Sequence, residues 1–131
     1  MTDGPRPRYD YVRDDAKRRI RVTVHERLSS EELIGIVDRQ AEEGTWGFGT
    51  LYDMRSLQDA APKTDLATVW ARVQTHIAEH GTRGPVALVT RAFGIVGAGQ
   101  MYATETLSRG FNVQVFWDLD DAEQWLSELA G

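Results

Sequence analysis

Asp53 and Arg55 directly follow a short apolar segment of this chain, and their side chains are of types that can bind a ligand. A carboxylate beside a guanidinium can orient a polar ligand through charge-assisted hydrogen bonds. In parallel sheets ligands bind outside the carboxyl ends of the strands, which is where this pair is expected. The simpler interpretation is structural: Asp53 caps the following turn and Arg55 pairs with it. If a ligand binds here, we expect Tyr52, Arg91 and Tyr102 to line the site as well.

A glycine-rich stretch that contains Gly94 and Gly97 stands where a strand is expected to give way to a helix. Free backbone N–H groups and the helix dipole can hold an anion at such a place, and Arg91 is near enough to assist. The spacing matches neither the dinucleotide fingerprint nor a P-loop, because no Gly-Lys-Ser/Thr follows. Close packing of the helix start is the simpler explanation of these glycines.

His76 and His80 are four residues apart, so on a helix they share a face and could bind a metal ion. We expect Glu79 on a different part of the helix, and the His-Glu-x-x-His order of zinc hydrolases is absent. A third ligand is therefore not evident, and solvated histidines near a helix end are expected instead of a metal site. The chain has no cysteine, which excludes a thiolate site and a disulfide scaffold.

No catalytic motif accompanies these residues. The hydroxyls of Ser29, Ser56 and Ser108 lie outside any Gly-x-Ser-x-Gly elbow, and no nucleophile–base pair can be identified. We therefore predict that the protein is not an enzyme and needs no cofactor. Trp46, in a glycine-flanked loop, is expected to be partly exposed, and Trp117, which ends a strand, is expected to line an end of the sheet.

The composition is that of one ordinary globular domain of 131 residues with a formal net charge of −5. This charge argues against nonspecific binding to nucleic acid or to an anionic membrane. No apolar run approaches the roughly 20 residues that span a bilayer, so no membrane insertion is expected. Residues 1–8 are polar and proline-containing, unlike a signal peptide, and we expect a flexible tail and a cytoplasmic location.

Local patterns predict the elements that would position these side chains. Apolar and polar residues alternate through a hairpin, Ser29 and Glu32 form a capping box, and apolar stripes mark further helices. The expected elements are strands Tyr9–Arg13 and Arg18–His25, a helix from Ser29 to Gly44, strand Gly49–Met54, helix Asp65–His80, strand Val86–Val89, helix Ile95–Arg109, strand Asn112–Trp117 and a last helix capped by Asp118. This ββαβαβαβα order predicts an α/β fold, with four helices on a mixed, mainly parallel sheet of four or five strands.

The element order and several phrases resemble the SpoIIAA-like proteins, the group with STAS and SEC14-type domains. The phrases are Gly44–Gly47, Leu51–Arg55, Arg83–Val89, and Val115–Ala122 with Trp125 and Leu126. The resemblance implies one domain over residues 9–131. In STAS proteins that antagonise anti-sigma factors, a serine is phosphorylated in an Asp-Ser-Ser-Gly-Leu-type phrase at the start of the helix after the third strand. That helix here begins at Lys63 without the phrase, and Thr64 and Ser56 are the remaining candidate hydroxyls.

The function that the resemblance implies is a noncatalytic regulatory or protein-interaction module with a protein partner. The alternative is a binder of a small, partly apolar or anionic ligand at the carboxyl ends of the strands. We also expect a homodimer, because right-handed crossovers between sequential strands place their helices on one face and leave the other apolar face bare. The competing expectation is that one helix covers that second face within the monomer.

Overall fold

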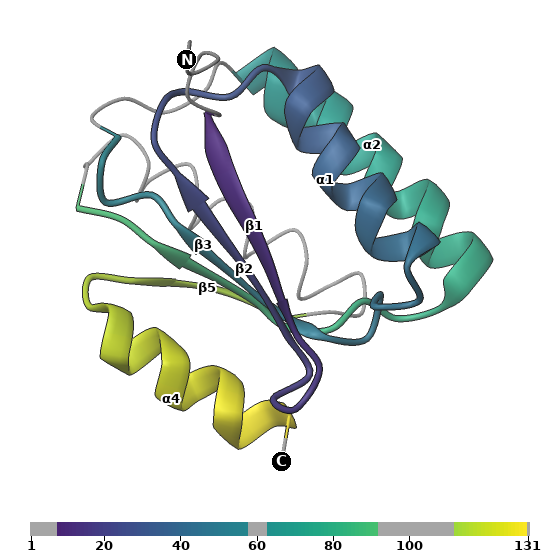
Figure 1. Cartoon of the computed structure of the whole chain (residues 1–131). Coiled ribbons are helices and arrows are strands. Elements are labelled where there is room, and N and C mark those ends of the chain that lie inside the picture. Colours follow the sequence, from purple (N-terminus) through teal and green to yellow (C-terminus); the bar gives the residue numbers. More distant parts are fainter. Residues whose placement is uncertain (1–7, 58–62, 92–111, 131) are drawn as a thin grey trace, which may run out of the picture.

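The computed structural model describes residues 8–57, 63–91 and 112–130. These residues form a five-stranded mixed sheet with helices packed against it (Figure 1). The strands are β1 (Tyr9–Asp14), β2 (Arg19–Val24), β3 (Gly49–Asp53), β4 (Val86–Val89) and β5 (Val113–Phe116). β1 and β2 form an antiparallel hairpin, and the other neighbours are parallel. Their spatial order is their order in the sequence, with β1 at an edge and β4 inside, and each of the five predicted strands is present.

Three helices accompany the sheet in the described ranges: α1 (Ser30–Glu42), α2 (Lys63–His80) and α4 (Leu119–Ala130). The expected capping box starts α1, since Ser29 accepts a hydrogen bond from the Glu32 backbone and the Glu32 side chain accepts one from the Ser29 backbone. After α1 the chain turns through Gly44 at a φ of 74°, which favours glycine. The helix expected over Ile95–Arg109 lies outside the described residues. The α/β class is thus confirmed.

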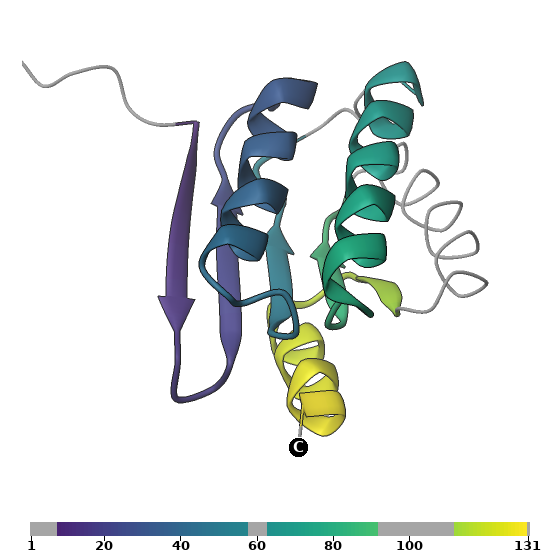
Figure 2. The ribbon, with the colours of Figure 1, turned by 90° about the vertical axis from the view of Figure 1, so that its right-hand side faces the viewer.

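α1 and α2 lie side by side on one face of the sheet, as Figure 2 shows. Both belong to β–α–β crossovers between neighbouring parallel strands, which are right-handed and so place their helices on the same side. The main core lies under them, because alternate side chains of the strands point to this face. Its fully buried members include Ile20, Val22, Ile36, Val37, Val73 and Val86.

α4 lies on the opposite face of the sheet, against β3, β4 and β5 (Figure 1). Ala122 and Leu126 of this helix pack on Leu51, Ala87 and Val89 as a second core. The expectation of a bare second face is therefore wrong, and the competing expectation, an intramolecular helical cover, describes this fold. The homodimer was expected because of a bare face, and that reason no longer applies. The homodimer stays a prediction.

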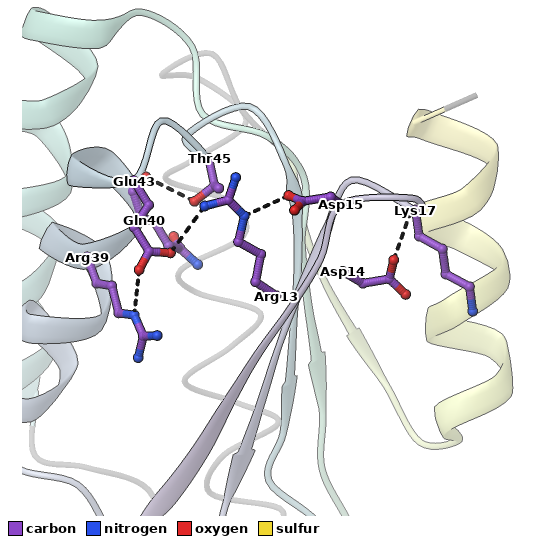
Figure 3. A network of polar contacts seen from close by, with 8 residues as sticks. All are labelled: Arg13, Asp14, Asp15, Lys17, Arg39, Gln40, Glu43 and Thr45. Carbon is purple, nitrogen blue, oxygen red and sulfur yellow. Dashed lines mark hydrogen bonds and ion pairs between the residues drawn. The ribbon is translucent and has the colours of Figure 1, made fainter.

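A cluster of charged groups joins the hairpin to the end of α1, as Figure 3 shows. Arg13 of β1 contacts Asp15 at 2.6 Å and Glu43 at 3.7 Å, and Arg39 of α1 contacts Glu43 at 2.9 Å. These pairs are exposed, so each contributes at most about 1 kcal/mol. They connect the hairpin turn to the last turn of α1.

None of the helices described here has the length and apolar character needed to cross a membrane.

Candidate functional site

The carboxyl ends of the parallel strands form one edge of the sheet, and we call it the carboxyl edge. The strand register aligns Thr23, Asp53, Val89 and Phe116 in one row across four strands. The residues just beyond that row therefore emerge at the same edge, as the sequence predicted for Arg55 and Arg91. This is the position where open parallel sheets bind ligands.

Asp53 is the buried centre of the carboxyl edge, with only 5% of its surface exposed. Its two carboxylate oxygens accept hydrogen bonds from Arg55 Nε at 2.9 Å and Nη2 at 2.8 Å. The Arg55 backbone N–H also donates to Asp53, at 3.2 Å, and Arg21 lies 4.0 Å away. Asp53 thus caps the turn and pairs with Arg55, as the structural interpretation predicted.

The pairing keeps the Asp53 carboxylate ionised. Hydrogen bonding from the Arg55 side chain lowers the pKa of Asp53 below its ordinary value, and this outweighs the opposing effect of burial. A general base works best with a pKa near the operating pH. Asp53 is therefore a weak proton acceptor at neutral pH, and its geometry is that of a positioning group for Arg55.

Asp53→Asn should reduce the stability of the fold at pH 7 by about 1–2 kcal/mol, because a charge-assisted hydrogen-bonded pair is lost. The folded pKa of Asp53 lies below the unfolded one, so the pair stabilises the fold fully above the unfolded pKa. This contribution disappears as the pH falls through the folded pKa. Urea unfolding at pH 7 and at about pH 3 should show the difference between wild type and variant shrinking in acid. The exposed Asp120→Asn is the control, and an equal difference at both pH values would contradict the assignment.

Arg91 and Trp117 form the exposed part of the carboxyl edge. The Arg91 guanidinium lies over the Trp117 indole, with Cζ 5.5 Å from the ring centroid, and its Nε donates to the Trp117 carbonyl at 3.4 Å. Asp118 contacts the same guanidinium at 3.5 Å. Trp117 follows the end of β5 and is 58% exposed. An aromatic ring and a guanidinium are thus presented together to solvent.

The remaining predicted site residues are dispersed or outside the described ranges. Tyr52 points to the face under α1 and α2 and is buried in the main core, so the structure does not bring it beside Asp53. Ser56 is exposed in the turn after β3, and Thr64 falls within the first turn of α2. Gly94, Gly97 and Tyr102 lie outside the described residues.

A second group of side chains of types that can bind a ligand lies at the carboxyl end of α2. His76 is only 6% exposed, so the expectation of a solvated histidine is wrong for this residue. Its Nε2 lies 2.6 Å from Asp38 Oδ1 of α1, and Arg72 donates to the same oxygen at 2.8 Å. Trp46 covers His76, with ring centroids 5.3 Å apart, and donates from its indole N–H to the Gly81 carbonyl. It is buried as well, which corrects the exposure expected for it.

The sequence interpretation also misplaced Glu79. Ligand atoms of His76, Glu79 and His80 all lie within 4.8 Å of one another, on one side of the helix. The signal was present in the spacing, because residues at i, i+3 and i+4 are neighbours on a helix surface. The burial of His76 carried no such signal, since it depends on Trp46 and Asp38 from other parts of the chain.

The comparisons with known proteins do not assign this chain to a family. No protein-family model, no curated protein and no solved structure matches the chain. The resemblance to the SpoIIAA-like proteins therefore stays a prediction from the quoted phrases. Both candidate sites, the carboxyl edge and the histidine group of α2, are defined by their own residues alone.

Proposed function

We propose that this protein is a noncatalytic, regulatory protein-interaction module that binds its partner at the carboxyl edge. The observation that carries the proposal is the exposed Trp117 ring with the Arg91 guanidinium stacked on it. Tryptophan and arginine are the residue types most enriched among the side chains that dominate binding energy at protein interfaces. A large exposed aromatic group held in place by its neighbour also loses little conformational freedom on binding.

The charge of the carboxyl edge indicates the kind of partner. The guanidiniums of Arg21, Arg55 and Arg91 stand beside the carboxylates of Asp53 and Asp118, and Asp120 and Asp121 follow in the first turn of α4. The edge therefore carries charges of both signs, on a chain whose formal net charge is −5. A partner surface that also carries charges of both signs fits it, because complementary charge selects the partner and speeds association.

The absence of catalysis belongs to the same proposal. The buried carboxylate of the edge is held ionised by Arg55, so its role is to orient a guanidinium and not to accept a proton.

The element order and the phrases quoted above support a SpoIIAA-like assignment, with a fourth helix over residues 95–109. The cytoplasmic location stays a prediction in the same way.

Site-specific photo-crosslinking in the native host tests the proposal. A benzophenone amino acid placed at Trp117 should give an adduct with one protein, and Arg91→Ala or Arg55→Ala should weaken that adduct. The matched control is the same group at Leu129, which is also exposed but lies on α4 away from the edge. Equal labelling from both positions, or no adduct at 117, would remove the carboxyl edge as an interaction surface.

The alternative function, binding of a small anionic ligand, rests on the partly exposed guanidiniums of Arg21 and Arg55 at the same edge. Titration with inorganic phosphate, followed by amide chemical shifts, distinguishes the ligand-binding function from the protein-interaction function. Saturable shifts at Asp53 and Arg55 would favour the ligand-binding function. Shifts confined to the hairpin turn at Asp14–Lys17 would exclude this edge as the ligand site.

A further inference from the structure

A buried histidine nitrogen without a partner lies at the carboxyl end of α2. Among the described residues, His76 Nδ1 is inaccessible to solvent and accepts or donates no hydrogen bond. Buried polar atoms are normally paired, and an exception of this kind in a folded protein often marks a ligand or ion. Nδ1 belongs to a side chain that is more than nine-tenths buried.

The other nitrogen of His76 is already held. Asp38 lies 2.6 Å from Nε2. Asp38 Oδ1 also accepts a hydrogen bond from Arg72 Nε at 2.8 Å, so this carboxylate oxygen acts as an acceptor. Nε2 therefore carries the proton and donates it to Asp38, which leaves the lone pair on Nδ1. A carboxylate that holds one ring nitrogen while the other binds the ion is the usual arrangement around metal-ligating histidines.

Two more ligand types complete the group. Glu79 and His80 offer a carboxylate oxygen and a ring nitrogen within 4.8 Å of each other and of a His76 nitrogen. The Glu79 and His80 side chains contact each other at 3.7 Å and are both exposed, so they can adjust to close around an ion. His76 is instead fixed by Asp38 and by the Trp46 ring.

We propose that His76 Nδ1, Glu79 and His80 bind a divalent transition-metal ion of the zinc class, with Asp38 orienting His76. Two imidazoles and a carboxylate are a donor set that Zn²⁺ accepts, with a fourth position open to water or to another molecule. Imidazole donors favour Zn²⁺, Ni²⁺ and Cu²⁺ over Mg²⁺ and Ca²⁺, which prefer oxygen ligands. The site lies at the end of the sheet away from the carboxyl edge, so it is independent of the proposed interaction surface.

Isothermal titration of the untagged chain with zinc chloride tests the site. We expect one zinc ion per chain. His80→Ala and Glu79→Gln should each weaken binding by at least about tenfold, since even loss of a partner outside the ligand shell costs about 10–100-fold. Both substitutions change exposed side chains, so the fold should persist, and circular dichroism verifies this. His25→Ala is the matched control, because it removes the remaining histidine, which lies outside this group, and should leave zinc affinity unchanged.

A second measurement uses Trp46, whose ring lies 5.3 Å from His76 and 6.4 Å from His80. Copper(II), a paramagnetic quencher, should reduce tryptophan fluorescence in the wild type and in His25→Ala, and much less in His80→Ala. Asp38→Asn should weaken zinc binding as well, through loss of the hydrogen bond to Nε2. Failure of the wild type to bind zinc, or unchanged affinity in His80→Ala or Glu79→Gln, would overturn the three-ligand site.

Discussion

Gly84→Ala should destabilise the fold by about 3 kcal/mol or more. A Cβ added at Gly84 would lie 2.3 Å from the Phe48 carbonyl oxygen and 2.5 Å from the Gly47 carbonyl oxygen. Both obstacles are backbone atoms, so no side-chain rotation can relieve them and the two loops must separate. Their separation would also strain the hydrogen bond from the Gly84 N–H to the Trp46 carbonyl, 3.0 Å long, beside the histidine group.

The matched control is Gly35→Ala in α1, where an added Cβ meets nothing within 4 Å. Alanine is preferred to glycine in an exposed helix interior, so this variant should be more stable than wild type by about 0.5–1 kcal/mol. Urea unfolding followed by circular dichroism measures both variants. A Gly84→Ala protein within about 1 kcal/mol of wild type would show that the loops separate easily, against the packing described here.

Leu126→Ala should cost about 3–5 kcal/mol, because the side chain is 0% exposed and its removal leaves a cavity between α4 and the sheet. Leu126 packs on Leu51, Ala87 and Val89, so the substitution directly tests whether α4 covers the second face within one chain. Urea unfolding at several protein concentrations should give the same midpoint for the wild type if the cover is intramolecular.

Leu129→Ala makes the same chemical change on the same helix at a position that is 46% exposed. Its effect should stay within about 0.5 kcal/mol, as for most surface substitutions. Similar losses for the two leucine variants would mean that α4 does not dock through Leu126. A wild-type midpoint that rises with protein concentration would instead favour the homodimer.

Local sequence patterns were sufficient to predict the helices and strands described here and one part of the carboxyl edge. Period-two alternation gave β2, the capping box gave the start of α1, and the apolar stripes gave α2 and α4. The pairing of Asp53 with Arg55 was predictable because the two residues are only two positions apart. The position of Trp117 at an end of the sheet was predictable because it stands just past a strand end.

Tertiary structure alone decided the features that depend on distant segments. The stripe that includes Leu126 shows that α4 buries one side, but not which face of the sheet it covers. The handedness rule fixes α1 and α2, which connect parallel strands, whereas α4 is not followed by a strand in the described chain and is free of that constraint. The burial of His76 has the same origin, because Asp38 on α1 and Trp46 in the loop before β3 enclose it from segments at least 30 residues away in sequence. Short-range spacing determines which side chains share a face, and only the packing of whole elements determines which of those faces lose their contact with water.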